Sequence, residues 1–154
     1  MKTIESKSSH QTFKLGEQMG KKIAQGISIA LQGELGAGKT TFVQGLAKGL
    51  GVCKKYYITS PTFNIINEYP VHSLTLCHLD LYRLESEDDL EDIGFNDLVD
   101  DTHVIVVEWP EILKRISFKF DIELNFKFDE QYNRIISIFA SGQAGSNLLS
   151  RLAL

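Results

Sequence analysis

The sequence lacks any long apolar run. Across its 154 residues no stretch approaches the 18 or more apolar residues that span a bilayer. Residues 1–13 hold no apolar segment of the kind that follows the lysine of a secretory signal. Only two cysteines occur, Cys53 and Cys77, and their spacing matches neither a metal motif nor a redox motif. We therefore expect reduced thiols, a cytoplasmic location and no membrane partner.

A basic excess is also missing. Lys and Arg total 16 against 20 Asp and Glu, a formal net charge of −4, whereas proteins that grip phosphate backbones usually carry surplus positive charge. The charge therefore disfavours direct binding of nucleic acid. Residues 54–57, with the sequence KKYY, keep open a contact with nucleic acid or a partner, although a solvated loop is the simpler interpretation. No linker or repeat divides the chain, so we expect a single domain, residues 1–154.

Apolar spacing predicts alternating strands and helices through the centre of the chain. The expected helices begin at Ser8 or Ser9, near Lys39, at Glu85 and near residue 147, and the first two end by Gly26 and Gly51. The expected strands are residues 27–31, 74–80 and 104–108, with a loop that contains extended segments at 53–69 and a hairpin formed by 120–128 and 134–140. This order predicts an α/β fold with a mostly parallel central sheet and an antiparallel C-terminal hairpin.

The stretch GELGAGKTT, residues 33–41, fits the pattern of a phosphate-binding loop. Gly33, Gly38, Lys39 and Thr40 occupy its fixed positions, between an expected strand and an expected helix. Glycines let successive N–H groups approach phosphate oxygens, and the start of the helix favours an anion there. The motif assigns Lys39 to the β- and γ-phosphates and the Thr40 hydroxyl to Mg²⁺. We therefore predict a three-layer P-loop NTPase fold.

Hydrolysis also needs an acidic group at the end of a neighbouring strand. Asp80 and Glu108 each end an apolar strand, so either can fix Mg²⁺ or orient water. Thr62 lies where a hydroxyl senses the γ-phosphate, although it is equally an ordinary turn residue. His78 is interpreted as a buried imidazole. Trp109 either fills core or anchors a nucleotide or a partner.

Three functions remain open from these residues: an ATPase that resets a partner complex, a small-molecule kinase, and a nucleotide sensor without hydrolysis. No Asn-Lys-x-Asp element for guanine occurs, which favours ATP over GTP. The four arginines are scattered and form no lid, which disfavours the kinase. With no arginine clearly placed as a finger, we expect slow hydrolysis alone and faster hydrolysis with partners.

The segments GELGAGKTTF, SPTF, HLDLYRL and VVEWPE, in this order, closely resemble the bacterial TsaE family. That family comprises the P-loop ATPases of tRNA threonylcarbamoyladenosine biosynthesis. The resemblance implies an accessory ATPase that uses ATP and Mg²⁺ to support two partners of the actin-like fold, which modify adenosine 37 of tRNA.

The resemblance also implies roles for individual residues. The family's phosphate-binding residues fall on Gly36, Ala37, Gly38, Lys39, Thr40 and Thr41, and its metal ligands on Thr40 and Glu108. Its switch threonine falls on Thr62, and the aspartate of the HxDLYRL element falls on Asp80. Further nucleotide contacts align with Ser9, Thr12 and Arg134, and Trp109 is included among the expected nucleotide contacts.

Overall fold

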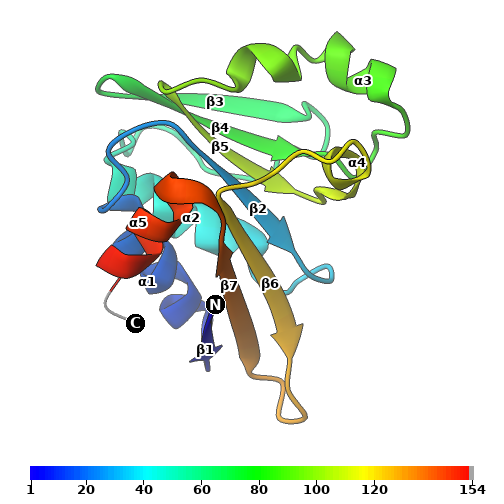
Figure 1. Ribbon diagram of the computed structural model, residues 1–154. Helices are drawn as coiled ribbons and strands as arrows, with labels where there is room; N and C mark the ends of the chain where they lie inside the picture. The colour runs from blue at the N-terminus through cyan, green and yellow to red at the C-terminus, as the bar shows by residue number, and fades with distance from the viewer. Residues whose placement is uncertain (153–154) are drawn as a thin grey trace.

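The computed structural model describes residues 1–152 and builds one seven-stranded sheet with helices on both faces (Figure 1). In chain order the elements are β1 (Lys2–Ser6), α1 (Ser9–Gly20), β2 (Ile27–Gln32), α2 (Lys39–Leu50), β3 (Ile66–Val71), β4 (Leu74–Asp80), α3 (Glu87–Asp92), the 3-10 helix η1 (Phe95–Leu98), β5 (His103–Glu108), α4 (Glu111–Arg115), β6 (Ile122–Phe128), β7 (Arg134–Ala140) and α5 (Gly142–Arg151).

The strands lie in the order β1-β7-β6-β2-β5-β4-β3. The four central strands β6, β2, β5 and β4 are parallel, whereas β7, β1 and β3 pair antiparallel with their neighbours. Central strands β2 and β5 are buried along almost their whole length, as expected of parallel strands covered on both faces. The predicted α/β fold with its C-terminal hairpin is thus confirmed.

Two apolar clusters hold the layers together. One packs α1, α2 and α5 against one face of the sheet through residues such as Met19, Phe42 and Leu148. The other packs α3, η1 and α4 against the opposite face through residues such as Leu90, Phe95 and Leu113. Figure 1 shows these helices on the two sides of the sheet. The glycine-rich loop described below follows the carboxyl end of the central strand β2 and leads into α2.

Several elements differ from the sequence-based expectation. The first helix, capped by Ser8, ends at Gly20 rather than near Gly26, so Ile23 lies outside it. The helix expected over residues 85–99 is two short helices, because Gly94 adopts a left-handed conformation (φ 69°) between them. The terminal helix begins at Gly142, earlier than predicted, and the last two residues of the predicted segment lie outside the described part of the chain.

Strands β1 and β3 and helix α4 were not predicted. β1 has a single large apolar residue, Ile4, and β3 contains Pro70, which is tolerated because β3 is an edge strand.

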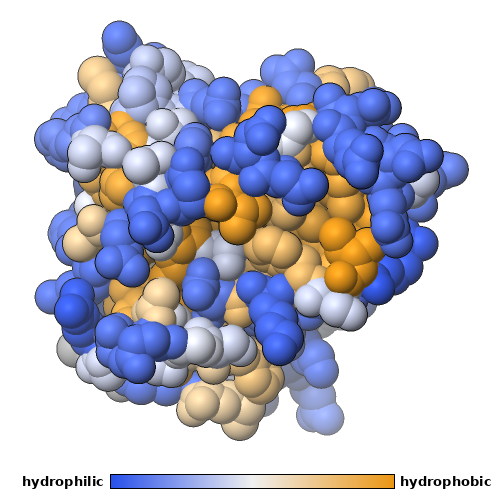
Figure 2. Space-filling view, turned by 45° about the horizontal axis from the view of Figure 1, so that its top comes forward, coloured by the Kyte–Doolittle hydropathy of each residue, from blue (hydrophilic) through white to orange (hydrophobic). Residues whose placement is uncertain are grey.

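Within residues 1–152, no helix combines the length and apolar character needed to cross a bilayer. Figure 2 shows apolar side chains gathered in patches on one face, framed by hydrophilic ones.

Candidate nucleotide-binding site

The loop between β2 and α2 is shaped to receive an anion. Gly36 and Gly38 have φ angles of 79° and 105°, in the left-handed region that other residues rarely adopt. A Cβ atom on Gly38 would also come within 3.0 Å of Arg134 Nε. Gly38 caps α2 without a side chain, so the positive end of the helix opens directly into the loop.

Lys39, the first residue of α2, is buried under this loop. Its Nζ donates to the carbonyl oxygens of Gly33 (2.6 Å) and Glu34 (3.0 Å), and lies 4.4 Å from the centre of the Trp109 ring. Burial lowers the pKa of Lys39, while the negative charges of Glu108 and other nearby acids raise it again. The ammonium group is therefore held in place beside the anion-binding backbone.

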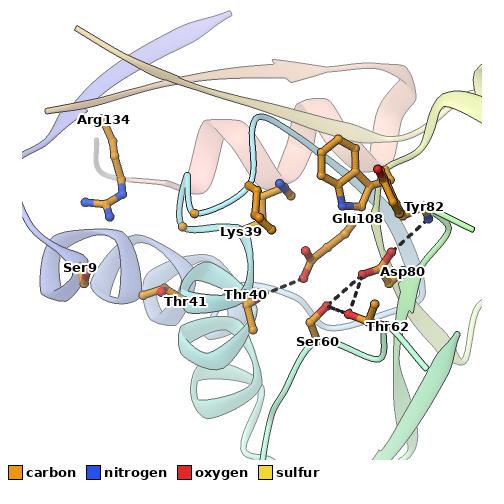
Figure 3. A pocket seen from close by; sticks show the side chains of 14 residues that line it. Ser9, Lys39, Thr40, Thr41, Ser60, Thr62, Asp80, Tyr82, Glu108 and Arg134 are labelled. Atoms are coloured by element: carbon orange, nitrogen blue, oxygen red, sulfur yellow. Dashed lines mark hydrogen bonds between the residues drawn. The ribbon is translucent and has the colours of Figure 1, made fainter. Parts of the chain in front are cut away.

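Two carboxylates face this ammonium from neighbouring strands. Asp80 ends β4 and Glu108 ends β5, and the register of the parallel pair places them directly opposite each other. Both are buried, with 6% and 4% of their surface exposed. The Thr40 hydroxyl donates to Glu108 Oε1 at 3.1 Å. The structure thus brings together a threonine hydroxyl and the two acids that the sequence assigned to the metal (Figure 3).

A network of hydroxyls surrounds Asp80. Ser60 and Thr62 donate to Asp80 Oδ2 at 3.0 Å and 3.3 Å, and the backbone N–H of Tyr82 donates to Oδ1 at 3.0 Å. Figure 3 shows both hydroxyls pointing at this carboxylate. The Thr62 side chain therefore joins the loop after α2 to the end of β4.

His78 contacts the other carboxylate. Its Nε2 lies 2.8 Å from Glu108 Oε1, and the imidazole is fully buried. Because an ionised carboxylate only accepts hydrogen bonds, Nε2 is the donor in this contact. Nδ1 has no hydrogen-bond partner among the described residues. The predicted burial is confirmed, and the contact with Glu108 is an addition to it.

The loop glycines Gly36 and Gly38, Lys39, Thr40 and the two carboxylates line one cavity of about 590 Å³, and His78 lies behind its wall. The half-buried Trp109 side chain forms part of the cavity wall. Its ring packs edge-on against that of Tyr82, with ring centres 5.0 Å apart. The backbone of Trp109 is in the left-handed region (φ 59°). Of the two interpretations for Trp109, core filler or anchor at a binding surface, the position in the wall favours the second. The cavity's polar groups converge inside an apolar wall, as in small-molecule sites.

The remaining predicted residues lie at different depths. Ser9, Thr41 and Arg134 line the cavity, and Arg134 Nε donates to the Ala37 carbonyl oxygen at 2.9 Å. Ala37 is itself buried in the loop. Thr12 is fully buried and pairs with the Ser6 hydroxyl at 2.8 Å, so it lies beneath the loop rather than in the cavity wall.

The donor set fits a magnesium nucleotide. A hydroxyl and two carboxylates supply the oxygen ligands that Mg²⁺ prefers, and the glycine loop with Lys39 supplies donors for phosphate oxygens. Sequence reasoning missed Leu35, Ser60 and Tyr82, which also line the cavity. Ser60 and Tyr82 lie inside the SPTF and HLDLYRL segments, so those segments were the available signal.

Comparison with known proteins identifies the family. The family model "Threonylcarbamoyl adenosine biosynthesis protein TsaE" matches residues 6–136. Proteins named tRNA threonylcarbamoyladenosine biosynthesis protein TsaE from Treponema pallidum and Aquifex aeolicus are 39% and 38% identical, over 86% and 80% of this chain and 96% and 88% of theirs. The crystal structure of Bacillus subtilis YdiB superimposes with a TM-score of 0.76 at 25% identity, over 97% of this chain and 91% of that one. This chain therefore belongs to the TsaE family.

Proposed function

We propose that this chain binds ATP with Mg²⁺ and hydrolyses it to ADP and phosphate, in support of threonylcarbamoyladenosine formation at adenosine 37 of tRNA. The observation that carries the proposal is the contact of Thr40 with Glu108, 3.1 Å apart, at the start of the helix that follows the glycine loop. Family membership supports the pathway, because the relatives are named for the biosynthesis of that nucleoside.

Each side chain has a distinct task in this proposal. Lys39 and the backbone of residues 36–41 hold the β- and γ-phosphates. Thr40 and Glu108 hold Mg²⁺, which neutralises charge on the phosphates when bound. Asp80, fixed by Ser60 and Thr62, is within reach of the same ion or of the attacking water. Ser9, Trp109 and Arg134 contact the nucleotide further out along the cavity.

Hydrolysis by the isolated chain is expected to be slow. Within the described residues, Arg134 is the sole arginine in the cavity wall, and its Nε is already bonded to the Ala37 carbonyl. A finger supplied by a partner accelerates hydrolysis roughly 10³- to 10⁵-fold in other P-loop proteins. The exposed apolar side chains of Leu35 and Tyr82 in the cavity wall offer such a partner a contact surface.

We propose two proteins of the actin-like fold as these partners, acting in the cytoplasm, without direct contact between tRNA and this chain. The net charge of −4 supports the last point. The acidic stretch of α3 is exposed, and a capping box between Ser86 and Asp89 satisfies the backbone N–H groups at its start. This arrangement fits a solvated helix and requires no basic partner.

The test follows ATP labelled at the γ-phosphate, with and without the two purified partner proteins. We expect label in free phosphate, slowly with the chain alone and much faster with partners. Glu108→Gln should abolish this release, and the matched control Glu91→Gln, on exposed α3, should not. Label on a metabolite would instead support a small-molecule kinase, and intact ATP under both conditions would support a nucleotide sensor.

A further inference from the structure

Three metal-ligating side chains meet on neighbouring strands, away from the nucleotide cavity. Glu68 of β3, Cys77 of β4 and His103 of β5 each place one ligand atom within 4.8 Å of the other two. Glu68 and Cys77 are directly opposite in the antiparallel ladder, with Cys77 Sγ 3.7 Å from Glu68 Oε1. Figure 1 shows the three strands side by side at one end of the sheet.

The histidine is oriented by a carboxylate. Asp100 Oδ1 lies 2.6 Å from His103 Nδ1, and the same oxygen accepts the backbone N–H groups of Thr102 and His103 at 2.7 Å and 3.0 Å. These bonds fix the Asp100 side chain in the turn before β5. A carboxylate on one ring nitrogen leaves the other nitrogen available to a metal ion. Metal-binding histidines almost always have a carboxylate, a backbone carbonyl or a water on their second nitrogen.

The chemistry of the three ligands selects the ion. Thiolate, imidazole and carboxylate together suit Zn²⁺, whereas Mg²⁺ prefers oxygen ligands alone. With zinc–ligand bonds of about 2.0–2.3 Å, the corners of a tetrahedron lie about 3.3–3.8 Å apart. The Cys77–Glu68 separation of 3.7 Å already falls in this range. Three protein ligands leave the fourth corner for water.

The position of the cluster separates it from the nucleotide. His103 begins β5 and Glu108 ends it, so the two ends lie about 16 Å apart at roughly 3.3 Å per residue. Cys77 is fully buried, His103 is half-buried and Glu68 is exposed, so the ligands form a path from the surface into the sheet. An ion here would tie the edge strand β3 to β4 and β5.

We propose that Glu68, Cys77 and His103 bind one Zn²⁺ ion, with Asp100 orienting the histidine, in a structural site that stabilises this edge of the sheet. The sequence alone gives no metal spacing for Cys77, because its partners lie 9 and 26 positions away and only the strand pairing brings them together. The site is independent of the proposed ATP chemistry.

Titration with Co²⁺, a spectroscopic substitute for Zn²⁺, tests the proposal in Cys53→Ser protein. Removing the exposed Cys53 leaves Cys77 as the sole thiol of the chain, and the nucleotide cavity contains none. We expect a thiolate-to-cobalt charge-transfer band and visible bands of tetrahedral strength, saturating at one ion per chain. Zn²⁺ should bleach these bands, and excess Mg²⁺ should not.

Ligand variants make the test specific. Glu68→Gln and His103→Gln, made in the same background, should weaken cobalt binding at least tenfold, and Asp100→Asn about 10- to 100-fold. Zn²⁺ should raise the melting temperature of the Cys53→Ser protein and leave that of Glu68→Gln unchanged. Glu68 is exposed, so this variant is expected to stay folded, which far-ultraviolet circular dichroism checks. Absence of the charge-transfer band, or equal binding by all variants, would overturn the proposal.

Discussion

Glu108 is the residue on which the contacts of the candidate site converge. One of its oxygens accepts from Thr40 on α2 and lies 2.8 Å from Nε2 of His78 on β4. The helix that follows the phosphate loop is thereby connected to the interior of the sheet. If Glu108 holds Mg²⁺ as proposed, it must keep one orientation, and we expect the imidazole behind it to act as a positioning group.

Replacing His78 tests this positioning role. His78→Leu should reduce the rate of ATP hydrolysis at saturation while the KM for ATP changes little, because Glu108 loses a partner that the nucleotide does not contact. His78→Gln should recover part of the rate, since an amide N–H can reach the same oxygen. Both are measured by phosphate release with partners present. A kcat for His78→Leu equal to that of the unaltered chain would contradict the role.

For individual residues, the sequence predicted those that occupy fixed positions of a motif. It missed contacts that arise only when separate segments fold together. Lys39, Thr40 and Glu108 were found from their places at the end of a strand or the start of a helix. Ser60 belongs to the SPTF segment, but its contact with Asp80 depends on how the loop folds back onto the end of β4. The pairing of His78 with Glu108 likewise depends on the register of β4 against β5.

At the scale of elements, the close packing of α1 on α2 supports the phosphate loop. A Cβ atom on Gly45 would lie 2.0 Å from the backbone oxygen of Phe13, and one on Gly16 would lie 2.2 Å from that of Phe42. Only glycine permits this approach, because backbone atoms cannot move aside as a flexible side chain can. The spacing of the two helices is therefore fixed by glycine.

Gly45→Ala should destabilise the fold by about 1–3 kcal/mol, because the two helices must separate to admit one methyl group. The loss is expected even though alanine has the higher helix propensity. Denaturant unfolding measures it. Gln18→Ala, at an exposed position of α1, is the matched control and should stay close to the unaltered chain. Equal stability of the two variants would refute the packing argument.

A second link between the same helices depends on pH. Glu17 of α1 accepts from Lys14 of the same helix and from its C-cap residue Lys21, and lies 3.4 Å from Lys48 of α2. These lysines, Lys14 foremost, lower the pKa of Glu17 from 4.5 to about 2. A lowered pKa in the folded state contributes stability that is present above pH 4.5 and is lost as the pH falls toward 2.

Glu17→Gln should therefore lower the free energy of unfolding at neutral pH, and the difference from the unaltered chain should shrink between pH 4.5 and pH 2. Denaturant unfolding at a series of pH values measures both effects. Glu91→Gln, on α3, serves as the control for removing one surface carboxylate. A gap that stayed constant across this pH range would show that the lysines are not its source.

The two strands that sequence reasoning missed share a position in the fold. β1 and β3 occupy the two edges of the sheet, and exposed or half-buried residues interrupt their apolar pattern. The buried strands β2 and β5 carry continuous apolar runs and were predicted within a residue or two. The helix predicted over residues 85–99 was too long. The apolar spacing continues past Gly94, but the left-handed backbone of Gly94 separates α3 from η1.

At the scale of the whole molecule, the candidate site exists only through folding. Its groups come from the start of α2, the loop before β3 and the ends of β4 and β5, and all of them meet at the carboxyl edge of the parallel strands. Chain order predicted this edge, because parallel strands must all end there. Arg134 reaches the same cavity from the start of β7, because β7 pairs antiparallel with β6 and so begins where β6 ends.

The central claim is that residues 36–41 hold the phosphates of ATP beside a divalent ion. Calorimetric titration of ATP with Mg²⁺ into the folded chain tests it most directly. Binding heat at one site is predicted. Lys39→Ala should weaken the affinity by about 1.5–3 kcal/mol, the contribution of hydrogen bonds to a charged group. The absence of heat from correctly folded protein, or an unchanged affinity in Lys39→Ala, would contradict the account.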